Sequence, residues 1–204
     1  MFFEPKDPQV LSHNPLYACI VPRPIGWIST LSEDGRANLA PFSFANAVSM
    51  APPMLMFCNN GVHAQGGVKD SAANAESTGE FVYNMATWDL REQMNLTSAT
   101  LPREVDEFDY AGLHKAPSRI VKPPRVAESP ICLECRTWKV LRLPPMPGGG
   151  NNIMVIGEIV GVHIADDAIS DGLVAITRIK PIARLGYTDY TVVHDSFSMT
   201  RPKI

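Results

Sequence analysis

The sequence has little of what marks nucleic-acid-binding, membrane or secreted proteins. It contains no run of lysine or arginine, and its net charge is −3 with a pI of about 5.9, so we expect neither nucleic acid nor an anionic membrane as a partner. No apolar stretch reaches the ~18 residues that a membrane-spanning helix needs. The N-terminal residues MFFEPKDPQ resemble neither a signal peptide nor a transit peptide. These absences predict a cytoplasmic protein.

Cysteine is scarce, with four residues in the chain. Cys132 and Cys135 lie three positions apart in an expected strand, where such positions point to opposite faces of the sheet. They are therefore not expected to hold one metal ion or to form a disulfide, and no second Cys/His pair stands at zinc spacing. We expect no metal site and four buried free thiols.

Two nucleotide-binding motifs are also missing. No GxGxxG follows a strand, and the glycines at 148–150 lack the Gly-Lys-Ser/Thr of a phosphate-binding loop. A nicotinamide nucleotide would therefore have to bind without a Rossmann domain.

Proline, in contrast, is abundant. Eighteen of the 204 residues, about 9% against a usual ~5%, separate short apolar runs. This pattern favours many turns and a mainly antiparallel β fold with a few short helices, and the length suits one core. We expect one domain, 1–204. The expected strands cover 16–21, 26–31, 38–44, 54–58, 80–85, 131–143 and 153–164, with a last one in 173–187 that ends at Pro181. The expected helices run from 69–71 to Gly79 with Asp70 or Ser71 as cap, over 88–98 with Thr87 as cap, and over 106–112.

The stretch 21–48 organises the chain. Asp34-Gly35 predicts a hairpin turn between two strands, and Pro41 marks an edge or bulge of the second, where backbone amides point outward. Thr30, Asn38 and Ser43 add short polar groups beside those amides. The stretch is typical of a site for an anion or a heterocycle.

Several segments follow one another in a familiar order. PRPIGWIST, NLAPFSFANAVS with the following PP, KDSAAN, STGEFVYNM, MNLTSA, DEFDYAGL and RLGY resemble the flavin reductase-like family of FMN-binding split barrels. The resemblance runs from about Pro22 to the C-terminal RP. It implies a split β-barrel of six or so strands, and a homodimer with FMN at the subunit interface. Residues 50–56 and 115–130 are candidates for that interface.

The resemblance also assigns a cofactor site. Lys69, Asp70 and Ser71 begin a helix, whose amides and dipole attract phosphate, and in the family this segment holds the FMN phosphate together with Ser/Thr groups such as Thr30 or Ser43. Without the resemblance, a capped surface helix and an ordinary strand bulge explain the same residues. The candidate cofactor-binding residues are Trp27, Ser29, Thr30, Asn38, Leu39, Ala40, Pro41, Ser43, Asn46, Lys69, Asp70 and Ser71.

Three of the candidates have a second interpretation. Trp27 either stacks near the cofactor or belongs to the core, and we favour the core. Arg184 and Tyr187 are candidates for the substrate side of the flavin, although a surface salt bridge explains Arg184 equally well. The family more often has glycine at the position of Tyr187.

The function implied is an NAD(P)H-dependent flavin oxidoreductase. Hydride passes from NADH or NADPH to FMN, and the reduced flavin goes to an acceptor such as a monooxygenase. This chemistry belongs to the cofactor, so no catalytic side chain is expected. The alternatives are a non-enzymatic FMN electron carrier of the flavoredoxin kind, reduced by a protein partner, an FMN oxidase such as the pyridoxine-phosphate oxidases, and a barrel without a cofactor.

Overall fold

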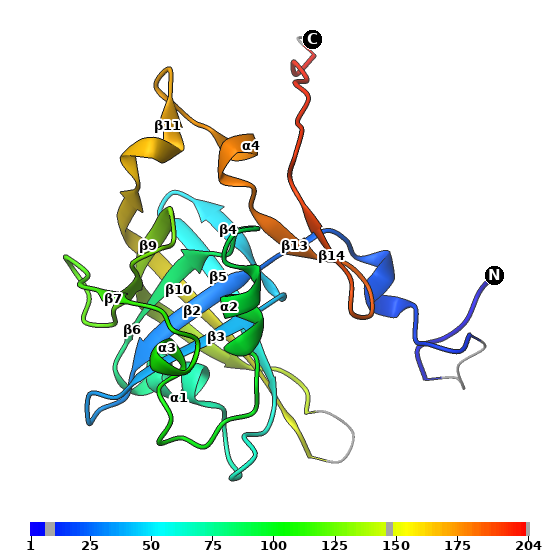
Figure 1. The fold of residues 1–204 in the computed structure, drawn as a ribbon. Coiled ribbons are helices and arrows are strands. Elements are labelled where there is room, and N and C mark those ends of the chain that lie inside the picture. The colour runs from blue at the N-terminus through cyan, green and yellow to red at the C-terminus, as the bar shows by residue number, and fades with distance from the viewer. Residues whose placement is uncertain (7–10, 146–148, 203–204) are drawn as a thin grey trace.

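The structure is a computed structural model that describes residues 1–6, 11–145 and 149–202, and it is mainly β (Figure 1). Seven antiparallel strands form the principal sheet in the order β3-β2-β6-β9-β10-β5-β4. They are β2 (Gly26–Leu31), β3 (Ala37–Phe42), β4 (Ala45–Met50), β5 (Pro53–Gly61), β6 (Glu80–Met85), β9 (Ile131–Arg142) and β10 (Asn151–Ile164). The mainly β expectation is confirmed, with seven strands instead of six or so.

The sheet curls into a barrel that stays open at one seam. Its two edge strands, β3 and β4, are joined by only two residues, Ser43 and Phe44. The Phe44 carbonyl accepts a hydrogen bond of 2.8 Å from the Cys58 amide. No ladder pairs β3 with β4 within the described ranges. Pro41 therefore lies on an edge strand, as expected, and it pairs with Trp27 in unbroken register, so there is no bulge at this proline.

Short elements surround the barrel. Three small sheets consist of β1 (Arg23–Pro24), β13 (Ile182–Arg184) and β14 (Tyr190–Val192), of β7 (Lys115–Ala116) and β8 (Arg125–Val126), and of β11 (Ile169–Ser170) and β12 (Leu173–Val174). The helices are η1 (Leu16–Cys19), α1 (Asp70–Ser77), α2 (Arg91–Leu96), α3 (Glu107–Tyr110), η2 (Asp166–Ala168) and α4 (Ile176–Ile179). None of the helices in the described part of the chain is long and apolar enough to cross a bilayer.

Two hydrophobic clusters fix the helices that flank the β2–β3 hairpin. Ala72 and Ala75 of α1 pack with Phe57 and Phe81 of the sheet. On the other side of the hairpin, Trp27 packs with residues of α2 and α3. The hairpin is therefore covered on both faces. Helices α1, α2 and α3, which come from separate parts of the sequence, all contact β3.

Trp27 is a core residue, as favoured. It is fully buried, and its Nε1 donates a hydrogen bond of 2.9 Å to Oγ1 of Thr97, just after α2. Buried tryptophans need such a partner for the indole N–H. This bond ties the segment that follows α2 to the barrel.

Several local predictions are wrong. Residues 16–21 do not form a strand: 16–19 are the 3-10 helix η1, closed by the Ala18 amide on the Pro15 carbonyl. The helix expected over 88–98 is only α2, because Thr87 pairs with Pro181 and the Trp88 amide bonds to the Lys180 carbonyl. The last strands, β13 and β14, follow Pro181 instead of ending there.

The helix from 69–71 to Gly79 is confirmed, but its predicted cap is wrong. Lys69 occupies the N-cap position without a side-chain cap bond. The Asp70 carboxylate pairs with Arg103, and the Ser71 hydroxyl accepts from Asn38. The C-terminal stop is as expected, since Gly79 has φ +74° after the C-cap Thr78.

All four cysteines are free, as expected. Cys132 and Cys135 are buried in different clusters, whereas Cys19 is exposed and Cys58 half-buried, so the expectation of four buried thiols is wrong for these two. Between β9 and β10, residues 146–148 lie outside the described residues.

The start of α3 gives a stability prediction. The Asp106 side chain caps this helix by accepting from the Phe108 amide at 2.9 Å, and Phe108 is fully buried. Asp106→Ala should cost about 1 kcal/mol of unfolding free energy and lower Tm by about 2–4 °C, measured by urea and thermal denaturation. Asp109→Ala is the control, because Asp109 lies on the same helix with a 76% exposed side chain. Equal effects of the two substitutions would contradict the cap.

Candidate functional site

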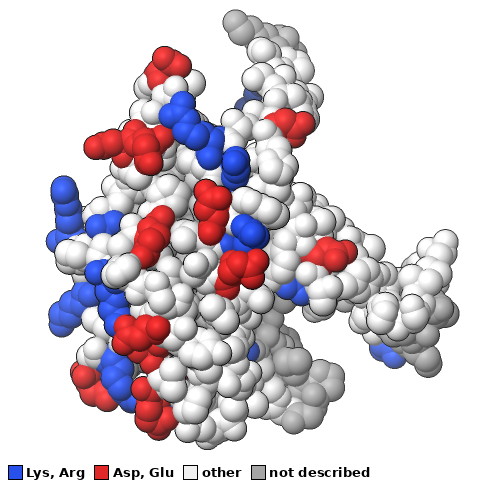
Figure 2. Space-filling view, viewed as in Figure 1, with Lys and Arg blue, Asp and Glu red and all other residues white. Residues whose placement is uncertain are grey.

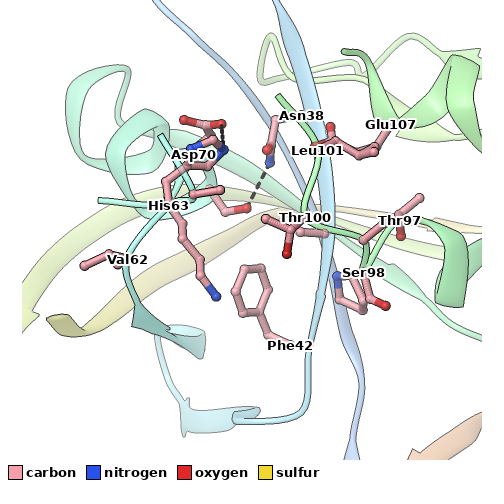
Figure 3. A pocket seen from close by; sticks show the side chains of 16 residues that line it. Asn38, Phe42, Val62, His63, Asp70, Thr97, Ser98, Thr100, Leu101 and Glu107 are labelled. Carbon is pink, nitrogen blue, oxygen red and sulfur yellow. Dashed lines mark hydrogen bonds and ion pairs between the residues drawn. The ribbon is translucent and has the colours of Figure 1, made fainter. Parts of the chain in front are cut away.

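A hollow of about 230 Å³ lies between the open edge of β3, the start of α1 and the segment after α2 (Figure 3). Figure 3 shows the Phe42 ring projecting into it between His63 on one side and Ser98 and Thr100 on the other. Its lining residues are Asn38, Ala40, Pro41, Phe42, Val62, His63, Ala64, Lys69, Asp70, Ser71, Thr97, Ser98, Ala99, Thr100, Leu101 and Glu107.

Lys69 supplies a free cation. Its side chain lies against Gly61, where an added Cβ would come within 4.0 Å of the Lys69 Nζ. Within the described ranges, no acid pairs with this ammonium group. Lys69 also stands at the N-cap of α1, whose first amides have no partner within the helix. Cation and helix dipole therefore favour an anion at the same place.

A chain of amide and hydroxyl side chains orients Ser71. The Nδ2 of Asn38 donates to Ser71 Oγ at 2.9 Å and reaches Thr30 Oγ1 at 3.3 Å. Thr30 Oγ1 also accepts from Asn74 at 3.1 Å. Because Ser71 is the acceptor toward Asn38, its own hydrogen stays available for a ligand in the hollow.

The edge of β3 is partly closed by an acid. Glu107 Oε2 accepts a hydrogen bond of 3.0 Å from the Leu39 amide, which points out of the sheet. Burial raises the pKa of the Glu107 carboxyl, and the Leu39 amide offsets only part of this rise. A half-buried acid thus stands at the wall of the hollow opposite α1.

The negative charge of Asp70 is balanced by Arg103, a residue outside the lining of the hollow. Its carboxylate forms an ion pair with Arg103 Nη1, and His63 Nε2 lies 3.7 Å from the other carboxylate oxygen. Burial, together with the charge of Arg103, lowers the pKa of His63. A lowered pKa favours the neutral imidazole at pH 7, so Lys69 is the cation of the lining, and no acid of the described residues pairs with it.

The sequence matches a known family. A family model described as a flavin reductase like domain matches residues 17–182. The chain belongs to the flavin reductase-like family. An uncharacterized protein of Halalkalibacterium halodurans is 36% identical over 189 residues, covering 93% of this chain and 90% of that protein.

Solved structures agree with the family. Nitrilotriacetate monooxygenase component B from Bacillus cereus superposes with a TM-score of 0.82 at 27% identity, covering 95% of this chain and 100% of that chain. Flavoredoxin of Desulfovibrio vulgaris superposes with a TM-score of 0.75 at 17% identity, covering 98% and 97%, which shows a shared fold. The fold is the split barrel of the flavin reductase-like family.

The hollow gathers six of the twelve candidate cofactor residues of this flavin reductase-like chain: Asn38, Ala40, Pro41, Lys69, Asp70 and Ser71. Thr30 is buried behind them and holds Asn38 and Asn74. Trp27, Ser29 and Leu39 are buried as well, and the Ser29 hydroxyl bonds to the Pro124 carbonyl.

The other candidates lie outside the hollow. Ser43 is half-buried at the β3–β4 corner, and Asn46 is exposed on β4, where its Oδ1 accepts from the Ala47 amide. Arg184 and Tyr187 lie in or next to the β13–β14 hairpin. The Arg184 guanidinium bonds to the Tyr190 hydroxyl and the Tyr187 carbonyl. Tyr187 has φ +57°, a backbone conformation that favours glycine and is therefore compatible with the glycine expected here from the resemblance.

Sequence reasoning missed the wall that faces β3. It consists of Thr97, Ser98, Ala99, Thr100 and Leu101, with Glu107 beyond them. The MNLTSA segment, residues 94–99, could have indicated this wall, since it contains the first three of these residues. The helix expected over 88–98 includes Thr97 and Ser98, which hid their place in the wall. His63 also lines the hollow and is not among the candidate residues.

A larger hollow of about 590 Å³ lies between α2 and the β13–β14 hairpin. Met94, Ile182 and Val192 supply its apolar side chains, and Trp88 and Tyr190 also line it. It contains neither the start of α1 nor an edge of the principal sheet, so chemistry favours the smaller hollow as the cofactor site.

The donor set of the smaller hollow fits a phosphate-bearing flavin. The unpaired Lys69 ammonium, the Ser71 hydroxyl and the first amides of α1 suit a phosphate, while Ala40, Pro41 and Phe42 offer an apolar edge beside it. The hollow is smaller than the ~300–1,000 Å³ of sites that enclose a whole ligand of this size. It therefore fits the phosphate end and leaves the ring to the surface beyond.

Proposed function

We propose that this protein is an NAD(P)H-dependent flavin oxidoreductase that binds FMN with its phosphate at the start of α1. The observation that supports this most directly is the unpaired Lys69 ammonium beside Ser71 and the open edge of β3, in a chain of the flavin reductase-like family. FMN supplies the hydride-accepting chemistry when bound. The chain binds and orients it and shields it from water.

In this proposal the flavin ring lies beyond the hollow, along β3 and over the corner that carries Ser43 and Asn46. The exposed residues next to this corner include Val48 and Met50, with exposures of 50% and 96%. Both chain ends also extend away from the barrel (Figure 1). A second copy of the chain that covers this corner would complete the ring site, so we propose a homodimer. Of the two candidate interface segments, 50–56 supplies the exposed Met50, whereas 115–130 buries Val121 and Val126 against the barrel.

The acceptor of the electrons is proposed from the relatives. The structure is similar to component B of nitrilotriacetate monooxygenase, which supports transfer of reduced flavin to a monooxygenase or another acceptor. The four free thiols agree with the cytoplasmic location that we expect. We treat 1–204 as one domain, most of which the family match covers.

The test is an absorbance experiment. Purified protein is mixed with FMN, desalted, and then given NADH or NADPH without oxygen, with free FMN as the control. The flavin bands should be retained and should bleach promptly with one of the two nucleotides. Light scattering on the same sample should give twice the chain mass of 22.3 kDa.

The alternative function is an FMN electron carrier, and the shared fold with flavoredoxin keeps it in the test. Bands that resist both nucleotides but bleach with dithionite would contradict the reductase and favour the carrier. No retained flavin, together with no nucleotide oxidation in excess FMN, would overturn both.

A further inference from the structure

Arg103 makes several contacts with one short loop. Its Nη2 donates to the carbonyls of Gly66 and Val68 at 2.9 and 3.1 Å, and its Nη1 pairs with Asp70. Its backbone amide donates to Gln65 Oε1 at 3.1 Å. The loop held in this way connects β5 to α1 and carries His63 and Lys69 into the hollow. Arg103 itself does not line the hollow.

The charges of the hollow are unbalanced without Arg103. Its lining has one cation, Lys69, and two carboxyl groups, Asp70 and Glu107. Figure 3 shows Asp70 at the end of the hollow next to Asn38, with Glu107 across from it. A phosphate entering beside Lys69 would meet the Asp70 carboxylate at the same helix start. Two negative charges at the same helix start repel each other strongly in a partly buried site.

We propose that Arg103 is the positioning residue that makes this site accept a phosphate. It cancels the charge of Asp70 and holds the loop so that Lys69 faces the hollow, without contacting the phosphate itself. Asp70 in turn anchors the guanidinium instead of capping α1, which explains why the helix starts with an acid at an anion site. This inference rests on the proposed FMN site and names the residue that gives it its preference for a phosphorylated flavin.

The test compares FMN with riboflavin, which lacks the phosphate. Dissociation constants for both are measured by flavin fluorescence at low ionic strength for the wild type, Arg103→Ala, Asp70→Asn and the double variant. The ratio of FMN affinity to riboflavin affinity should fall about tenfold in Arg103→Ala. It should rise in Asp70→Asn, and the double variant should regain most of the loss.

Arg142→Ala is the matched control. Arg142 forms a bidentate pair with Glu76 at the other end of the same helix, with distances of 2.9 and 2.8 Å. Removing it should leave the affinity ratio unchanged.

The outcomes separate this inference from the proposed function. A purely structural Arg103 would lower both affinities alike and leave the ratio unchanged, which overturns the inference while wild type still prefers FMN. A wild type with no preference for FMN over riboflavin would instead overturn the phosphate site itself. If Arg103→Ala does not fold, Asp70→Asn decides alone, because a ratio that fails to rise contradicts the charge argument.

Discussion

Lys69→Ala is expected to weaken FMN binding by about 1.5–3 kcal/mol, or about 13- to 160-fold, because the variant loses a charge-assisted hydrogen bond to the phosphate. The fold should be almost unaffected. Lys69 makes no side-chain cap bond at the start of α1, and no acid within the described ranges depends on it. Fluorescence titration gives the FMN affinities of the wild type and of the variant, and urea denaturation gives their free energies of unfolding.

The control for Lys69→Ala is Lys139→Ala. Lys139 is exposed on β9, above Trp138 and outside the lining of the hollow. It should leave FMN affinity unchanged, so any nonspecific effect of net charge would appear in both variants. Unchanged FMN affinity in Lys69→Ala would remove the phosphate assignment, and an equal loss for riboflavin would place Lys69 elsewhere along the flavin.

Local signals predicted the scaffold of the site well. Asp34-Gly35 sets the turn between β2 and β3, and Pro41, with no amide to donate, indicated an edge. Gly79 ends α1 because its positive φ suits glycine. The error at 16–21 has a related cause: a short apolar run looks like a strand, but Tyr17 and Ile20 are exposed and the backbone closes a 3-10 turn.

The contacts that build the walls of the hollow join residues far apart in the sequence, so local sequence patterns could not predict them. Leu39 meets Glu107 across 68 positions, and Asn38 meets Ser71 across 33. Neither partner has a signal at its own position that names the other. The same holds for the helix cap, since Ser71 is a good capping residue by itself, but Asn38 engages its hydroxyl. The resemblance to the flavin reductase-like family predicted a site at the start of α1, whereas only the fold shows which side chains line the hollow there.

Glu134 gives the largest stability effect that we expect. This residue of β9 is fully buried, and its carboxylate accepts from the amides of Arg119, Ile120 and Val121 at 2.7, 2.6 and 2.9 Å and from His163 Nε2 at 2.5 Å. It fastens the segment between β7 and β8 to the principal sheet. Burial alone would raise the pKa of this carboxyl, but the hydrogen bonds outweigh burial and lower its pKa from 4.5 to about 2.

The sign of the pH dependence follows from that lowered pKa. The folded state binds the proton of Glu134 less readily than the unfolded state, so the carboxylate stabilises the fold above pH 4.5 and loses this effect as the pH falls toward 2. The full effect is about 3 kcal/mol. Glu134→Gln should therefore be about 3 kcal/mol less stable than wild type at pH 7, with a difference that narrows steadily below pH 5, measured by urea denaturation.

The matched control is Glu158→Gln, because Glu158 is an exposed acid on the neighbouring strand β10. It should change the free energy of unfolding by less than about 0.5 kcal/mol at both pH 7 and pH 3. A Glu134→Gln difference that stays constant from pH 7 to pH 3 would show that shape, and not the charge of the carboxylate, holds the segment. The charge explanation requires convergence at low pH, because protonated Glu134 and glutamine are both neutral groups facing the same three amides.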